Sequence, residues 1–315
     1  MKRFLSAALA AAALLAGCNL GDSDVSAGRR PRFESPAGAE PPRMALVLGS
    51  GGPRGFAHIG VLKVLDEEGI RPDLVIGSSV GAMVGALYAG GLDAKHLERL
   101  AYEINVMEFF EVRMITGGLP TGRAVQDYVN ARVGGEPIER LKVPFAAAAT
   151  RERDRALVIF NCGDTGLAVR AASASPGQFE PVRIGAENYL DGDESSPVPI
   201  RAARELGARV VIAVDVSAYL NETPPSAPQE WITKDQRRAK QILAEAPGAD
   251  VLIHPNIGYY AGHTEEYRRR VIAQAERATR AKIPEIRAAL ARAGVKPPAA
   301  QASATARIPA GEASR

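Results

Sequence analysis

The sequence reads Met44-Ala45-Leu46-Val47-Leu48-Gly49-Ser50-Gly51-Gly52-Pro53-Arg54-Gly55, an apolar run that leads directly into a glycine-rich loop. The same design occurs again in Leu74-Val75-Ile76-Gly77-Ser78-Ser79-Val80-Gly81. Short apolar runs that end at glycine are typical of buried strands, and the segments 56–68 and 80–89 that follow have the composition of helices. The two stretches therefore predict two strand–turn–helix units, with a sharp turn at the end of each strand.

Apolar runs and amphipathic segments alternate along the rest of the chain. Further strands are expected at 144–150, 156–161, 209–216 and 251–254. Further helices are expected at 94–105, 124–133, 229–246 and 264–293. The segment 106–121 is aromatic and irregular. This alternation predicts an α/β fold, a three-layer α/β/α sandwich around a mainly parallel central sheet.

Composition divides the chain into four parts. Its 315 residues are 46% hydrophobic, which suffices for one large domain, expected over 44–295. Residues 1–17 combine Lys2-Arg3 with a short Ala/Leu-rich core and are predicted to be a signal peptide. Residues 18–43 are expected to be a flexible tether because they are rich in Gly, Ser, Pro and Arg. The Pro/Ala-rich residues 296–315 are expected to be a disordered tail.

Cys18 follows Leu15-Ala16-Gly17, which resembles the lipobox of bacterial lipoproteins, where the cysteine is lipid-modified. An ordinary secretory signal or an uncleaved anchor is the alternative. Asn19 differs from the aspartate of an inner-membrane retention signal, so we expect a lipoprotein of the outer membrane, facing the periplasm. Cys162 then has no cysteine partner and is expected to be a half-buried structural thiol. The net charge of +3 predicts no nucleic-acid partner.

The pattern Gly77-x-Ser79-x-Gly81 matches a nucleophile elbow, the sharp turn that exposes a catalytic serine between a strand and a helix. Small residues on both sides leave room for the reversal. The N-terminus of the following helix would stabilise negative charge that develops on the serine oxygen. The alternative is a serine that only caps the helix, a role that Ser78 fits better than Ser79. The pattern favours Ser79 as the nucleophile of an acyl-transfer reaction.

The glycine-rich loop 49–55 has two interpretations. A dinucleotide-binding fingerprint would need glycine where Arg54 stands, and a P-loop would need a Gly-Lys-Ser/Thr ending, so phosphate binding is weakly supported. The other interpretation is an oxyanion hole, because the backbone N–H groups of Gly51 and Gly52 are unobstructed by a Cβ. Arg54 would then brace the loop or attract an anionic head group.

These motifs together resemble the patatin-like phospholipase family. The matching segments within 44–216 are Gly51-Gly52-Pro53-Arg54-Gly55, His58-Ile59-Gly60-Val61-Leu62, Gly77-Ser78-Ser79-Val80-Gly81, Ala171-Ala172-Ser173-Ala174-Ser175-Pro176-Gly177, Asp191-Gly192-Asp193 and Pro197-Val198-Pro199. The resemblance implies a patatin-like fold and a Ser–Asp dyad with Ser79 as nucleophile and Asp191 as base. It also implies an oxyanion hole that includes Gly51, Gly52, Arg54 and Gly55.

One residue departs from the family pattern. Asp193 stands where the family usually has glycine or alanine, and a second carboxylate there could raise the pKa of Asp191 or crowd the site. By itself Asp191-Gly192 is also a common turn. A Ser–His–Asp triad remains an alternative, because His254 and His263 follow Asp191 in the chain order of such triads.

The remaining site predictions concern histidines, metals and aromatic residues. His58 is expected to be packed or to cap the first helix, and His96 to be exposed. The spacing of His, Cys, Asp and Glu predicts no metal site, and no cofactor is expected. Met107, Phe109 and Phe110 could form a lid or an acyl pocket, or could belong to the core.

These features predict a serine acyl hydrolase that cleaves phospholipid or lysophospholipid esters at a membrane to which its lipid anchor holds it. One alternative is an esterase or thioesterase that acts on soluble acyl substrates. Another is a non-catalytic, lipid-binding lipoprotein, which the Asp193 departure supports. The sequence does not identify a protein partner.

Overall fold

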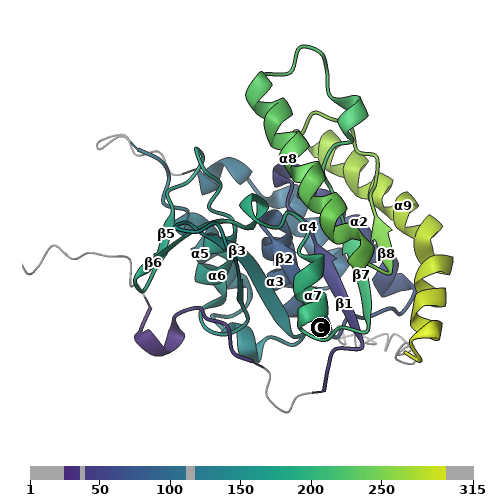
Figure 1. Ribbon diagram of the computed structural model, residues 1–315, viewed down its shortest axis with the longest axis horizontal. Helices are drawn as coiled ribbons and strands as arrows, with labels where there is room; N and C mark the ends of the chain where they lie inside the picture. The colour runs from purple at the N-terminus through teal and green to yellow at the C-terminus, as the bar shows by residue number, and fades with distance from the viewer. Residues whose placement is uncertain (1–24, 36–39, 111–117, 296–315) are drawn as a thin grey trace, which may run out of the picture.

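The computed structural model describes residues 25–35, 40–110 and 118–295 (Figure 1). These residues form an eight-stranded sheet in the order β5-β6-β3-β2-β1-β7-β8, and β4 pairs with β3. The strands are β1 (Met44–Leu48), β2 (Leu74–Ser78), β3 (Phe145–Arg151), β4 (Leu157–Phe160), β5 (Val182–Ile184), β6 (Glu187–Asp191), β7 (Val210–Val214) and β8 (Val251–Ile253).

The central strands β3, β2, β1, β7 and β8 pair in parallel, whereas β4, β5 and β6 pair antiparallel with their neighbours. The helices are α2 (Ala57–Glu67), α3 (Val80–Ala89), α4 (Ala94–Glu103), α5 (Arg123–Arg132), α6 (Thr165–Ala172), α7 (Ile200–Glu205), α8 (Gln229–Glu245) and α9 (Glu265–Arg292). The short 3-10 helices are η1 (Ala27–Arg29), η2 (Gly52–Phe56), η3 (Val106–Phe109), η4 (Ile138–Arg140), η5 (Gly192–Glu194), η6 (Leu220–Glu222) and η7 (Ala246–Gly248).

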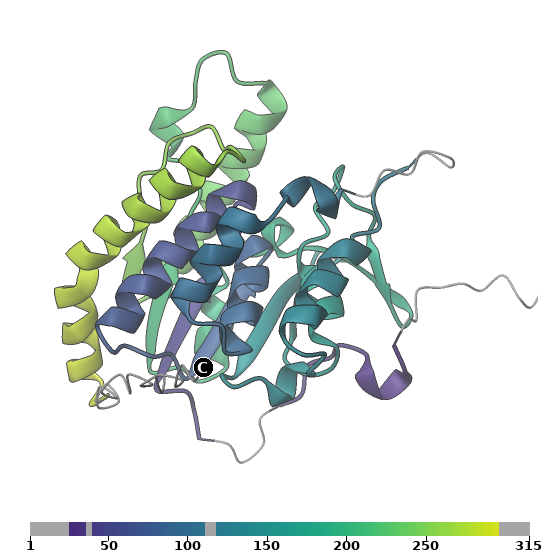
Figure 2. The ribbon, with the colours of Figure 1, turned by 180° about the vertical axis from the view of Figure 1, so that it is seen from behind.

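Helices cover both faces of the sheet, so the predicted three-layer sandwich is confirmed. Leu46 and Val75 belong to a large core shared with α2, α3, α4, α5, α6 and α9. Val47 and Ile76 point to the opposite face, into a smaller core shared with α7 and α8. The two layers are visible from the front, where α7 and α8 lie, and from behind, where α2 and α9 lie (Figures 1 and 2).

Four elements between residues 161 and 209 were not predicted: α6, β5, β6 and α7. Each is short, and β6 reads Glu-Asn-Tyr-Leu-Asp, a mixed pattern without a clear strand period. The predicted elements are all present, with ends that shift by at most two residues. Helix α9 continues through Pro284, as the helix expected over 264–293 requires, although proline removes one backbone hydrogen bond there.

Residues 25–35 lie against the domain, which differs from the flexible tether expected over 18–43. The Arg32 N–H donates to the Cys162 carbonyl at 3.0 Å, and Arg29 forms an ion pair with Asp164 at 3.0 Å. Cys162 is 2% exposed, more buried than predicted, and burial raises its pKa to about 11. The predicted signal peptide 1–17, Cys18, the tail 296–315 and part of the irregular segment, 111–117, lie outside the described residues.

The sheet register brings two distant segments together at one point. Ala148 of β3 pairs with Ser78, the last residue of β2, and the next residue, Ala149, pairs with Asp191, the last residue of β6. The glycine-rich loop follows β1, where the strand order changes direction between β2 and β7. Clefts for ligands form at such switch points, outside the carboxyl ends of parallel strands.

Among the described residues, no helix has both the length and the apolar composition needed to cross a membrane.

Candidate active site

Ser79 occupies a strained turn between β2 and α3. Its φ is 55° and its ψ is −127°, and Arg155 is the other described residue besides glycine with a positive φ. A Cβ at position 77 would lie 2.3 Å from the Gly81 carbonyl oxygen, and one at position 81 would lie 2.1 Å from the Leu48 carbonyl oxygen. Glycine is therefore required on both sides of Ser79, as in a nucleophile elbow.

The alternative that Ser78 caps the following helix is wrong. Ser78 is the last residue of β2 and is fully buried. Ser79 itself takes the N-cap position of α3, but its side chain makes no capping hydrogen bond. Its hydroxyl is directed elsewhere.

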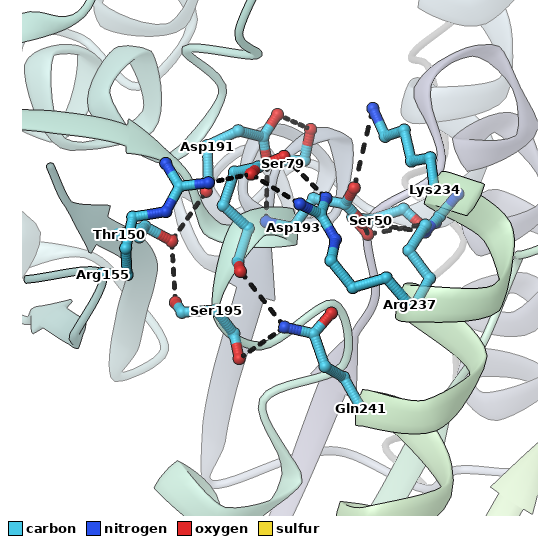
Figure 3. Close-up of polar contacts among 12 residues, drawn as sticks. Ser50, Ser79, Thr150, Arg155, Asp191, Asp193, Ser195, Lys234, Arg237 and Gln241 are labelled. Carbon is cyan, nitrogen blue, oxygen red and sulfur yellow. Dashed lines mark hydrogen bonds and ion pairs between the residues drawn. The ribbon is translucent and has the colours of Figure 1, made fainter. Parts of the chain in front are cut away.

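The Ser79 hydroxyl donates a hydrogen bond to Asp191 Oδ2 at 2.7 Å (Figure 3). The second carboxylate oxygen of Asp191, Oδ1, accepts from the Asp193 N–H at 2.8 Å. The Thr150 hydroxyl donates to the Asp191 carbonyl oxygen at 2.8 Å, which holds the backbone of Asp191 in place. The two residues predicted as a dyad are thus in hydrogen-bond contact.

Asp191 has an unusual proton affinity for a carboxylic acid. Its pKa is raised from 3.8 to about 7, chiefly because the side chain is almost completely buried. The nearby charge of Asp193 contributes to this increase, while the hydrogen bonds from the Asp193 N–H and the Ser79 hydroxyl oppose it. A carboxylate with a pKa near neutrality can accept a proton from a hydroxyl far better than an ordinary aspartate.

The glycine-rich loop lies directly beside the turn that carries Ser79. A Cβ at Gly55 would be 2.4 Å from the side chain of Val80, the residue that follows Ser79. Gly51 is the N-cap of η2 and Gly52 its first residue, and within the described part of the chain their N–H groups have no hydrogen-bond acceptor. Two such N–H groups next to a serine hydroxyl can stabilise an oxyanion.

Arg54 braces the loop. Its Nη2 donates to the Tyr259 carbonyl oxygen, which connects η2 to the segment after β8. Burial lowers the pKa of Arg54, and the positive charge of Arg238 lowers it further. Of the two roles considered for Arg54, these contacts support the brace.

The described residues place no histidine within hydrogen-bond distance of Ser79 or Asp191, so the contacts do not support the triad alternative. His254 Nε2 bonds the Ser217 carbonyl at 3.0 Å, and its ring stacks on Tyr219. His263 is exposed. His58 is packed as predicted: its Nε2 bonds the Gly49 carbonyl at 2.8 Å, and burial lowers its pKa to about 4.

Helix α8 supplies charged residues to the site that sequence reasoning missed. Asp193 Oδ1 lies 2.9 Å from Arg238 Nε and accepts a hydrogen bond from the Ser50 hydroxyl at 2.5 Å. Arg237 of the same helix binds Glu194 at 2.8 Å. In the sequence, the departure from the family pattern at Asp193 was the one sign that this position is unusual. Nothing in the sequence indicated that Arg238 is its partner.

The other predictions for this region have mixed outcomes. Phe109 packs edge-on against Tyr128 and Phe110 stacks on Phe179, both at 5.2 Å between ring centroids, whereas Met107 is 60% exposed. Among the described residues, no group of His, Cys, Asp and Glu is arranged to hold a metal ion.

Comparison with known proteins identifies the family. A family model described as patatin-like phospholipase matches residues 46–204. An uncharacterized NTE family protein of Mycobacterium tuberculosis is 31% identical over 212 residues, which cover 65% of this chain and 59% of that protein. A protein of Coccidioides immitis named lysophospholipase NTE1 is 31% identical over 187 residues, which cover 58% of this chain and 12% of that protein.

A solved structure agrees on the fold. VipD from Legionella pneumophila matches with a TM-score of 0.54 and 14% sequence identity, over 85% of this chain and 72% of that chain. The fold and the turn at Ser79 define an α/β protein with a serine on a nucleophile elbow. The match of the family model over half of the sequence shows that the chain belongs to the patatin-like phospholipase family, as its motifs predicted.

The raised pKa of Asp191 makes a prediction about stability. Folding favours the protonated form, so the stabilisation is fully present below the ordinary pKa of 3.8 and is lost as the pH rises through about 7. Asp191→Asn should therefore be more stable than the wild type at pH 8, by up to roughly 1.4 kcal/mol for each unit of pKa difference, and the gain should disappear near pH 4. Urea unfolding across this range measures it.

Ser79→Ala is the matched control for this comparison, because it removes the hydroxyl and keeps the carboxyl group. It should still lose stability as the pH rises, with the loss moved to slightly higher pH because the Ser79 hydrogen bond that lowers the Asp191 pKa is gone. A stability difference between Asp191→Asn and wild type that stays constant from pH 4 to pH 8 would contradict a raised pKa.

Proposed function

We propose that this protein is a serine acyl hydrolase that cleaves lipid acyl esters, with phospholipids or lysophospholipids as substrates. The observation that carries this proposal is the 2.7 Å hydrogen bond between the hydroxyl of Ser79, whose backbone is strained, and the buried carboxylate of Asp191. Membership of the patatin-like phospholipase family and a relative named lysophospholipase support the same class of substrate.

The proposed reaction proceeds in two steps. Asp191 accepts the Ser79 proton while the serine oxygen attacks the ester carbonyl, and the N–H groups of Gly51 and Gly52 hold the resulting oxyanion. When the tetrahedral intermediate collapses, Asp191 returns the proton to the departing alcohol and Ser79 keeps the acyl group. Water then attacks the acyl-enzyme while Asp191 accepts its proton. Collapse of this second intermediate releases the fatty acid, and Asp191 returns the proton to the Ser79 oxygen.

Activity measurements with single variants test the dyad. Purified protein should hydrolyse lysophosphatidylcholine and a short-chain chromogenic ester, and Ser79→Ala and Asp191→Asn should each lose about 10³-fold or more in kcat. Ser78→Ala is the matched control, since the neighbouring Ser78 hydroxyl is buried and takes no part in the proposed reaction. It should stay within about twofold of the wild type.

A folded wild-type protein that neither turns over an ester nor reacts with a fluorophosphonate would point to the non-catalytic, lipid-binding alternative. Preference for short-chain soluble esters over lysophosphatidylcholine would favour the esterase alternative. Equal losses in Ser78→Ala and Ser79→Ala would show that the variants damage the turn rather than the nucleophile.

Exposed apolar side chains favour a lipid over a soluble substrate. Leu220, Trp231 and Tyr260 are 46%, 51% and 60% exposed, and we call these three residues the apolar rim. The loop before α8 that separates Leu220 from Trp231 extends beyond the sheet, at the top of Figure 1. Large apolar groups gathered at a projecting edge are typical of a surface that contacts a membrane.

Hydrogen bonds join the segments of the rim to one another and to the oxyanion loop. Asn256 Nδ2 donates to Glu222 Oε1 at 2.8 Å, and the Tyr259 hydroxyl donates to Asp235 of α8 at 3.0 Å. Because Arg54 of the oxyanion loop binds the Tyr259 carbonyl, the rim borders the proposed catalytic site.

Fluorescence can test contact between the rim and lipid, because Trp231 is the only tryptophan of the chain. Vesicles of phosphatidylcholine should shift its emission to the blue, and brominated phosphatidylcholine should quench it. Leu220→Ser and Tyr260→Ser should each weaken partitioning by roughly tenfold, the cost of losing one large buried apolar side chain.

Leu243→Ser is the control, because Leu243 is 71% exposed but lies near the opposite end of α8. It should leave partitioning unchanged. An emission spectrum that does not respond to vesicles would contradict contact between the rim and the bilayer, and would favour soluble substrates.

We also propose that Cys18 is lipid-modified and anchors the protein to the outer membrane, on the periplasmic side. The support is the small-residue segment before Cys18 in the sequence. In bacteria fed an alkyne fatty acid, the wild type and Cys162→Ser should incorporate label and fractionate with the outer membrane. Cys18→Ser should lose both properties, and labelling of Cys18→Ser would refute the assignment.

A further inference from the structure

Three segments meet at a buried pair of opposite charges. Asp193, in the loop after β6, lies 2.9 Å from Arg238 of α8, and both side chains are less than a tenth exposed. Lys234 approaches the second carboxylate oxygen of Asp193 at 3.8 Å. Arg238 also donates from Nη2 to the carbonyl and hydroxyl oxygens of Ser50, at 3.1 and 3.2 Å. The pair therefore touches the loops that carry both halves of the proposed catalytic site.

The neighbouring contacts hold the same loop by other means. Glu194 binds Arg155 at 2.5 Å and Arg237 at 2.8 Å. Gln241 Nε2 donates to the carbonyl oxygens of Glu194 and Ser195, at 3.1 and 3.4 Å. Since these contacts do not involve Asp193, its charge can be removed without releasing the loop from α8.

A buried ion pair contributes little net stability, because desolvation of both charges offsets their attraction. Stability alone does not explain why Asp193 stands where related motifs have glycine or alanine. The position of the carboxylate does: Asp193 follows Asp191 by two residues, accepts from the Ser50 hydroxyl and donates its own N–H to Asp191.

We propose that Asp193 and Arg238 are positioning residues, which join the base loop to the oxyanion loop and set the charge around Asp191. This inference rests on the proposed function, in which Asp191 is the base. Asp193 disfavours the ionised form of Asp191, and Arg238 limits that effect because it neutralises Asp193. Helix α8 thereby tunes a carboxylate that it does not touch.

The charged groups around Asp193 and Arg238 together determine whether Asp193 is ionised and how it acts on Asp191. Asp193 and Glu194 lie on η5, Lys234, Arg237 and Arg238 on α8, Arg155 in the turn before β4, and Arg54 on η2. Burial alone would raise the pKa of Asp193, but Arg238 and the Ser50 hydroxyl outweigh it, so the pKa of Asp193 is lowered and the group carries a charge at neutral pH.

Two substitutions should therefore have opposite effects. Asp193→Asn removes a negative charge beside Asp191, so the acidic limb of kcat/KM against pH should move down by roughly one unit. Arg238→Met removes the positive charge that balances Asp193, while the Ser50 hydroxyl, Lys234 and Arg237 still favour the ionised form of Asp193. The same limb should therefore move up by a similar amount. Both variants should lower kcat more than they change KM, since neither residue is expected to touch the substrate.

Further variants separate positioning from folding. Arg238→Lys keeps the positive charge. Its acidic limb of kcat/KM should therefore lie at the wild-type pH, and its kcat should be partly restored. Asp193→Asn combined with Arg238→Met leaves no unpaired charge, and its limb should lie between those of the single variants. Lys240→Met, on an exposed part of α8, is the control for a charge change on this helix and should move nothing.

Carbon-13 titration of the Asp191 carboxyl group gives a readout that needs no activity. In protein labelled at the aspartate carboxyl carbons, with Asp191→Asn to assign the signal, the Asp191 pKa should fall in Asp193→Asn and rise in Arg238→Met. The inference would be overturned if the Asp191 pKa did not change in these variants. It would also be overturned if kcat fell while the acidic limb of kcat/KM stayed at the wild-type pH. A wild type without activity but with these opposite shifts would refute the proposed function and leave the inference standing.

Discussion

Strand β3 is the constraint on which the site depends, because it pairs with two strands that are distant in sequence. Parallel β2 and antiparallel β6 meet it at adjacent residues, Ala148 and Ala149, so that both strands end at the same point. A serine and a carboxylate 112 residues apart thereby come within hydrogen-bond distance. Their separation is set by backbone pairing, which is among the least adjustable contacts in a protein.

The site contains a strained backbone and several buried polar groups, each of which costs stability. Ser79 has a strained backbone, Asp191 is a carboxyl group buried almost completely, and Asp193 and Arg238 are charges removed from water. Such departures from local preference are found where a protein retains them for chemistry. The surrounding sheet and the large core beneath it supply the stability that offsets them.

Helix α8 differs from the helices on the other face of the sheet. Its buried residues are Arg238 and Ile242, so polar contacts with the loop after β6 hold it in place more than apolar packing does. A charged helix thus covers the loop after β6 on one side, while an apolar layer covers the sheet on the other (Figures 1 and 2). The same helix begins beside Trp231, at the edge proposed to meet the membrane.

The sequence by itself determined the strand–turn–helix units and the place of Ser79 on a sharp turn. Tight turns impose local demands, such as Gly77 and Gly81 around Ser79, and local demands leave visible patterns. It also predicted Asp191 through a family motif, but it did not predict β6, which carries that residue, because five mixed residues have no readable period. Only the tertiary structure decided which groups surround Asp191, its proton affinity and its connection to α8. These depend on burial and on contacts between residues far apart in the chain, and neither leaves a pattern in the local sequence.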